Sequence, residues 1–270
     1  GIEIQSLRIS VLLITPLMVI MIYSMGKKIM PSGFALLVAL FMLSAPSMYY
    51  NRFYTFFVIL NLYCLINVLE KRNRASLAGL GMAIFLSSFF KFEVTLFSLL
   101  ISLTLLAFLF FTKHGQFDFR FAPVKAASST GSSAKIYYLG VPIILFMVYL
   151  GQDGYFLKVF KLVVDAHEVW GNPFPEIFPF FALLEEIGAH QMFERALFYL
   201  PIVTYVAVAS LLLTPLITKK ESFPISYFMV IAILLFGVCA FGLVIWRAGF
   251  DNLLRTLPPF YLLLCYLLYR

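Results

Sequence analysis

Four cations stand at the ends of long apolar runs in this chain: Arg52, Lys91, Arg247 and Arg255. A charge placed inside a membrane costs about 2.5–3.5 kcal/mol on insertion scales, so such a residue is a candidate for function. Arginine and lysine are also the usual donors to phosphate oxygens. These residues therefore predict a cationic cluster that binds a phosphate. The alternative is that each side chain separately extends toward lipid headgroups.

The stretch Ser44–Thr55, SAPSMYYNRFYT, surrounds one of these cations with aromatic side chains. It separates two apolar runs and contains a proline, three tyrosines and Arg52. Such a composition is unusual for a simple connection between membrane spans. The stretch predicts the rim of an active site on the non-cytoplasmic side, with Arg52 and Tyr54 at its end.

Lys91 and Glu93 stand at the tip of a predicted tight hairpin between two apolar helices. Residues at i and i+2 do not face each other on a helix, so a simple ion pair between the two is not expected. One side chain is predicted to enter a pocket and the other to reach water. A solvated turn is the alternative.

Acidic and histidine residues gather in one later segment, at Asp165, His167 and Glu168, with His190 further on. Several of them would have to converge to bind a metal ion. Sugar binding and an ordinary polar loop are the alternatives. The chain has no P-loop, HExxH, GxSxG or dinucleotide-binding glycine motif. The sequence therefore assigns no metal and no cofactor, and it leaves a divalent metal open.

The composition identifies the class of protein that must position these residues. The chain has 270 residues, of which 62% are hydrophobic and 12% charged, against about 45–50% and about 25% in soluble domains. Apolar runs of about 18 residues or more are typical of membrane helices. We expect an all-α, polytopic bundle that forms one integrated domain over residues 1–270. Cytoplasmic cations explain the net charge of +7 better than a nucleic-acid partner does.

Nine spans are predicted. They cover Leu7–Gly26, Ser32–Met48, Phe53–Leu69, Ala75–Phe90, Val94–Thr112, Ile136–Leu150, Ala196–Thr218, Ile225–Ile245 and Leu257–Tyr269. Positively charged residues favour the cytoplasmic side, which places Lys27 and Lys28 inside and the four cations of the cluster outside. A polar inner linker is then expected at 113–135 and an amphipathic outer loop at 152–195. The host membrane is a cell (inner) membrane or an ER-like membrane.

Four segments give the chain a resemblance to a known family. They read GIEIQSLRISVLL with IYSMGKKI, SAPSMYYNRFYTFFVILNLY, LAGLGMAIFLSSFFKFE, and LLRTLPPFYLLL. In this order they are similar to the GT-C superfamily of membrane glycosyltransferases, of the protein mannosyltransferase and aminoarabinose-transferase type. The resemblance covers roughly the first hundred residues and the C-terminus.

The resemblance implies an enzyme that moves a sugar from a polyprenyl-phosphate donor to a glycan, lipid or protein acceptor outside the cytoplasm. It implies that Arg52 and Tyr54 line the site, that Lys91 and Glu93 lie beside it, and that Arg255 holds the donor phosphate. Arg247 joins this set as a further outer cation. The family's catalytic aspartate follows its first membrane helix, and this chain is expected to begin after that position, as a fragment of a longer enzyme. A transporter or flippase of a lipid-linked sugar and a non-catalytic membrane subunit are the alternatives.

Overall fold

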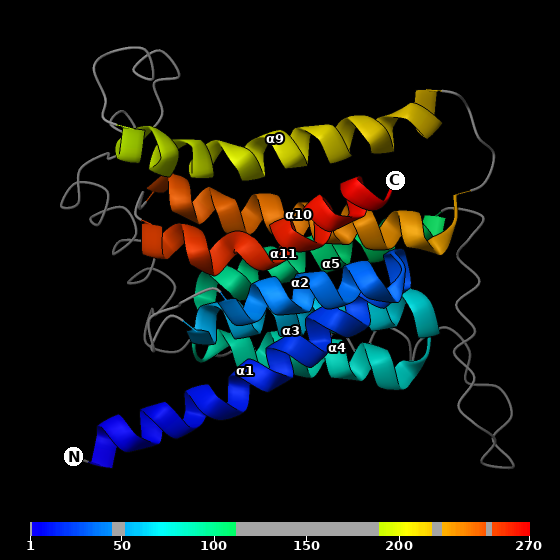
Figure 1. Ribbon diagram of the computed structural model, residues 1–270. Coiled ribbons are helices and arrows are strands. Elements are labelled where there is room, and N and C mark those ends of the chain that lie inside the picture. The colour runs from blue at the N-terminus through cyan, green and yellow to red at the C-terminus, as the bar shows by residue number, and fades with distance from the viewer. Residues whose placement is uncertain (1, 45–51, 112–188, 218–222, 247–249) are drawn as a thin grey trace, which may run out of the picture. The chain divides into compact units, whose positions relative to one another are not determined.

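The computed structural model describes residues 2–44, 52–111, 189–217, 223–246 and 250–270. All regular structure in these ranges is helical, which confirms the all-α prediction for the part of the chain described. The eight helices are α1 (Ile2–Ile29), α2 (Ser32–Ser44), α3 (Arg52–Lys71), α4 (Arg74–Ser88), α5 (Phe92–Phe111), α9 (Ala189–Ile217), α10 (Ile225–Trp246) and α11 (Phe250–Tyr269) (Figure 1).

Among the described residues, three helices are long and apolar enough to cross a membrane, at Phe53–Lys71, Phe198–Pro215 and Ile225–Gly242. A helix suits such sequences because it satisfies every backbone hydrogen bond within the segment, and lipid offers no substitute. The apolar parts of α2, α4, α5 and α11 are shorter. The 13 residues of α2 span about 20 Å, against a bilayer core of about 30 Å. Nine spans remain a prediction, and Ile136–Leu150 lies outside the described residues.

Most helices follow the predicted spans closely, but α9 and α11 begin clearly earlier, and α11 starts at Phe250 where the predicted span starts at Leu257. The predicted span beginning at Ala196 is part of a longer helix, α9, which begins at Ala189. The end of the predicted outer loop at 152–195 is therefore helical, as the helical spacing of His190 and Glu194 predicts. Gln191, Glu194 and Arg195 are good helix formers, so the helix continues where the apolar run has stopped. Hydropathy locates the apolar part of a helix and misses such a polar extension.

The chain divides into two compact units, which are described separately. The first unit contains Gly1–Tyr63 and Pro173–Arg270, and the second contains Cys64–Asn172. The boundary falls within α3. The prediction of one integrated domain stays a prediction.

In the first unit, α1 and α2 form a tight hairpin. Gly26 in the last turns of α1 is buried, and a Cβ atom there would lie 2.9 Å from the Cβ of Ala35 on α2. The same atom would lie 3.7 Å from the Cδ2 of Leu262 on α11. Real Cβ atoms essentially never approach to 2.9 Å, so glycine permits the close approach of α1 to α2, whereas the distance to α11 is an ordinary contact.

The helix α11 packs against α2, α9 and α10 within the same unit. It runs antiparallel to α2, since the ring of Phe34 contacts Tyr269 and the ring of Phe41 contacts Tyr261, at centroid distances of 6.0 and 5.6 Å. Figure 1 shows these two helices side by side. The end of α11 therefore lies with the start of α2, and its beginning lies toward the end of α2.

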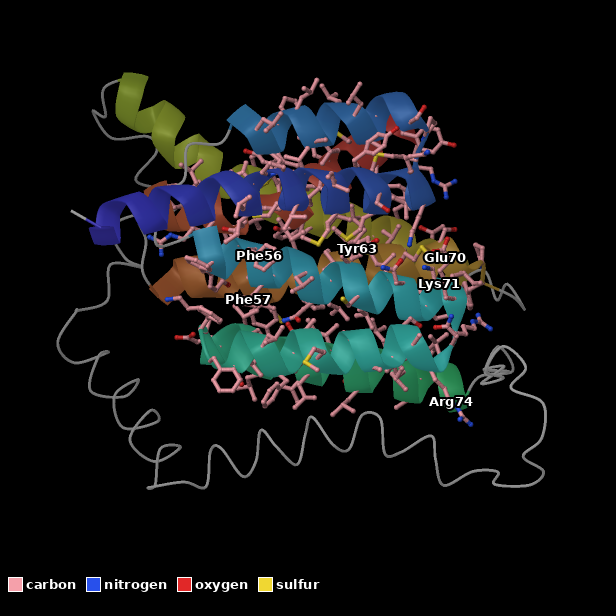
Figure 2. The ribbon with its side chains drawn as sticks, turned by 90° about the horizontal axis from the view of Figure 1, so that it is seen from below. Phe56, Phe57, Tyr63, Glu70, Lys71 and Arg74 are labelled. Carbon is pink, nitrogen blue, oxygen red and sulfur yellow. The ribbon has the colours of Figure 1, made fainter. Side chains whose placement is uncertain are left out.

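In the second unit, a short turn joins α3 to α4. Lys71 ends α3, and Arg72 has a φ of 49°, in the left-handed region that often ends a helix. Asn73 then caps α4, because its Oδ1 accepts a hydrogen bond from the Ser76 backbone N–H at 2.8 Å. Figure 2 shows Lys71 and Arg74 on either side of this turn. Polar residues thus set the turn locally.

Candidate functional site

The two adjacent prolines of α11 leave carbonyl oxygens in its first turns without their usual helical donors. Pro259 has no backbone N–H, so the carbonyl oxygen of Arg255, four residues earlier, loses its helical donor. The helix nevertheless continues through both prolines. The hydroxyl of Thr55 on α3 supplies the missing donor, because its Oγ1 donates to the Arg255 carbonyl oxygen at 3.2 Å. A side chain from another helix thus donates to the carbonyl oxygen that Pro259 leaves without a helical partner.

This hydrogen bond joins residues 200 positions apart within the first unit. Thr55 is 2% exposed and its neighbour Tyr54 is 7% exposed, so the start of α3 is buried there. On α11, buried Thr256 donates to the carbonyl oxygen of Leu253 at 2.9 Å. The end of the stretch SAPSMYYNRFYT and the segment LLRTLPPF therefore lie against each other. Both had been selected from the sequence as parts of one site.

Arg255 is half-buried, and its Nε atom is shielded from solvent. A guanidinium in such surroundings interacts with an anion more strongly than one in bulk water. Among the side chains described in the first unit, the cations are Lys27, Lys28, Arg255 and Arg270, and none is acidic. The described part of this unit therefore carries a net positive charge.

The other predicted members of the cluster are described to different extents. Arg52 is the first residue of α3, so its backbone precedes Tyr54 and Thr55 by less than one helical turn. Its side chain is outside the described set, and Arg247 lies outside the described residues altogether. The structure thus brings Tyr54 and Arg255 into one region through Thr55.

Lys91 and Glu93 belong to the second unit, where the predicted hairpin is confirmed. The helix α4 ends at Ser88 and α5 begins at Phe92, with Lys91 in the turn between them. The hydroxyls of Ser87 and Thr95 hydrogen-bond across the turn at 2.9 Å. The Lys91 backbone N–H also donates to the Ser87 carbonyl oxygen at 2.8 Å. This turn is therefore held by its own polar groups.

The exposure of the two charged side chains in this hairpin differs. Glu93 is exposed and Lys91 is half-buried. The expectation that one of them reaches water fits Glu93. A pocket for Lys91 remains a prediction.

Sequence reasoning missed Thr55, Thr256 and the close pair formed by Tyr205 and Gly237. A Cβ atom at Gly237 on α10 would lie 2.9 Å from the Cε1 atom of Tyr205 on α9, so this ring lies directly over the glycine. The sequence pointed to only one side of the contact between Thr55 and Arg255, namely the carbonyl oxygen of Arg255. Consecutive prolines mark free carbonyls on their own helix, but nothing in the sequence says which donor reaches them.

Within the described residues, no group of three or more histidine, cysteine, aspartate or glutamate side chains is placed to bind a metal ion. Asp165, His167 and Glu168 lie outside the described residues, and for His190 only the helical backbone is described. A divalent metal therefore stays open, as in the sequence analysis.

Comparisons with protein-family models, with curated proteins and with solved structures find no match to this chain. The function is therefore inferred from the residues and their geometry.

Proposed function

We propose that this protein is a membrane glycosyltransferase of the GT-C type, which takes a sugar from a polyprenyl-phosphate donor on the non-cytoplasmic side. The observation that carries the proposal is the hydrogen bond from Thr55 to the carbonyl oxygen of Arg255. It supports a single site built from two segments that the sequence had marked for phosphate chemistry. The three long apolar helices are consistent with a membrane location.

The chemistry follows from the charge of the donor. Transfer breaks the bond between the sugar's anomeric carbon and a phosphate oxygen, and it forms a bond from an acceptor hydroxyl to that carbon. Negative charge grows on the departing lipid phosphate, and a fixed cation stabilises it more in the transition state than in the ground state. Arg255 would bind this phosphate from α11, and Arg52 would do so from the start of α3. No general base is assigned among the described residues.

The position of the proposed site also suits the donor's long hydrocarbon tail. Each helix that contributes to the site is largely apolar, and the tail of a polyprenyl phosphate stays in the bilayer. Its phosphate is therefore presented at the membrane surface, where the first turns of α3 and α11 lie in the predicted orientation. Tyr54, next to Thr55, would form part of the wall around the sugar.

Sugar transfer by the full-length protein tests the proposal. The assay follows a labelled sugar from a polyprenyl-phosphate donor to acceptors in reconstituted membranes. Arg255→Gln should lower kcat/KM by about tenfold to a hundredfold, because a charge-assisted hydrogen bond contributes about 1.5–3 kcal/mol. The control is Lys71→Gln, which removes one exposed cation from the end of α3 and should leave transfer unchanged.

Three other results would count against the proposal. Normal transfer by both Arg52→Gln and Arg255→Gln would remove these residues from the site. Movement of the labelled lipid between leaflets without sugar transfer would indicate a flippase. Donor binding without turnover in the full-length protein would indicate a non-catalytic subunit.

A further inference from the structure

A second group of cations lies at one end of the first unit and is not used by the proposed reaction. Lys27 and Lys28 occupy the last turn of α1, and Arg270 follows the end of α11. Gly26 packs closely against Ala35 at the start of α2, and Phe34 beside it contacts Tyr269. Three helix ends therefore meet here. We call Lys27, Lys28 and Arg270 the basic end of the first unit.

This basic end is separated from Arg255 along α11. Arg255 stands in the second turn of that helix and Arg270 follows its last residue. The intervening length is about 22 Å at a rise of about 1.5 Å per residue. A phosphate bound by Arg255 is thus out of reach of Arg270, and the basic end needs a separate explanation.

Each cation of the basic end lies over a tyrosine ring. Lys27 Nζ is 5.6 Å from the centroid of the Tyr23 ring, and Lys28 Nζ is 5.8 Å from that of Tyr63 on α3. The Arg270 guanidinium carbon is 5.3 Å from the centroid of Tyr266, whose hydroxyl also accepts a hydrogen bond from Arg270 Nε at 3.1 Å. Such contacts restrict the conformations of long side chains. The basic end therefore presents its charges in an ordered arrangement.

An exposed apolar stripe begins at the same end. On α2 it consists of Leu36, Leu37, Leu40 and Leu43, all exposed, and Leu268 at the end of α11 is 66% exposed. A surface with ordered cations at one end and exposed leucines along the adjoining helix matches an amphipathic ligand. The phosphate of such a ligand meets the cations, and its acyl chains lie along the stripe.

We propose that the basic end binds an anionic bilayer phospholipid, with its headgroup phosphate at Lys27, Lys28 and Arg270 and its acyl chains along α2. Basic pockets between helices at the cytoplasmic face are typical sites for anionic lipid headgroups. A soluble anion would make no use of the leucine stripe. This site is distinct from the donor site and does not depend on the proposed transferase activity.

Lipid retention by the purified protein tests the proposal. The protein is equilibrated in detergent with equal amounts of phosphatidylglycerol and phosphatidylcholine, and bound lipids are counted by native mass spectrometry. The wild type should retain phosphatidylglycerol at least about tenfold more than phosphatidylcholine. The variant combining Lys27→Gln, Lys28→Gln and Arg270→Gln should lose this preference. The charge-matched control with Lys113→Gln, Lys125→Gln and Lys135→Gln should keep it.

A second variant keeps every charge, so it remains informative if neutralising the basic end impairs insertion. Tyr23→Leu combined with Tyr63→Leu removes two of the rings and should lower phosphatidylglycerol retention about threefold or more. If the basic-end variant and its charge-matched control lost the preference for phosphatidylglycerol equally, overall charge would explain the preference, and the proposal would be overturned. Unchanged retention in the tyrosine variant, or no preference in the wild type, would also overturn it. Retention of free inorganic phosphate in place of the lipid would identify a soluble anion as the ligand.

Discussion

At the scale of single residues, Pro259 and Thr55 together decide which donor the carbonyl oxygen of Arg255 has. Pro259 removes the donor that the Arg255 carbonyl oxygen would have had in a regular helix. Thr55 replaces it with a hydroxyl from α3. A buried carbonyl without a partner is costly, so this contact fixes the spacing between α3 and α11. Thr55 is therefore a positioning residue for Arg255, and its role does not require contact with a substrate.

Substitution of Thr55 tests this role directly. Thr55→Val keeps the shape and removes the donor, so the free energy of unfolding should fall by about 1–3 kcal/mol, the usual cost of a buried unsatisfied acceptor. Thr55→Ser keeps a hydroxyl and should lose less. Thr104→Val, at an exposed threonine of α5, is the matched control. Equilibrium unfolding in detergent micelles measures all three.

A double-mutant cycle separates this role from simple packing. Pro259→Ala restores the backbone N–H that the Arg255 carbonyl oxygen lacks. In that background Thr55→Val should cost clearly less than in the wild type, because the acceptor has regained a donor. Equal costs in the two backgrounds would show that Thr55 acts through packing alone.

At the scale of helices, close crossings need small residues at defined points. Gly26 lets α1 approach α2, and Gly237 lets the ring of Tyr205 lie over α10. A further tie between α9 and α10 is the hydrogen bond from the Tyr227 hydroxyl to the Leu212 carbonyl oxygen, at 2.7 Å. Helices in lipid associate through such close packing and hydrogen bonds, since the hydrophobic effect gives them little attraction. The first unit is held together in this way.

Gly26→Val tests the tightest crossing. Its side chain would overlap Ala35, so α1 and α2 must separate, and we expect the free energy of unfolding to fall by about 1–3 kcal/mol or more. Gly33→Ala is the control, because a Cβ atom at Gly33 meets nothing within 4 Å. Unfolding in detergent micelles measures both variants. Equal stability of the two would contradict the close approach described for Gly26.

At the scale of the whole molecule, the sequence predicted helices well because lipid leaves an apolar segment few alternatives. It predicted the α4–α5 hairpin around Lys91 because a short polar break between two apolar runs allows little else. The predicted spans left out the first turns of α9 and α11, where polar residues extend each helix beyond its apolar run. Boundaries in such places depend on helix propensity, which hydropathy does not record.

The candidate site was predictable only in part. Arg52, Tyr54 and Arg255 were selected because cations and tyrosines at the ends of apolar runs are unusual. Their grouping was an expectation, and its support comes from the contact between Thr55 and Arg255. Thr55 itself gave no sign, because its partner lies 200 residues away and threonine is common in membrane helices. Long-range pairing of this kind depends on how helices pack, and no local pattern encodes it.

The central claim is that Arg255 binds the phosphate of a polyprenyl-phosphate donor, and donor binding by the full-length protein tests it most directly. The measurement compares the Kd of a radiolabelled donor for the wild type, Arg255→Gln and Lys71→Gln in the same detergent. The account predicts that Arg255→Gln raises the Kd at least about tenfold, equivalent to about 1.4 kcal/mol, and that Lys71→Gln leaves it unchanged. An unchanged Kd for Arg255→Gln, or an equal rise in both variants, would contradict the claim.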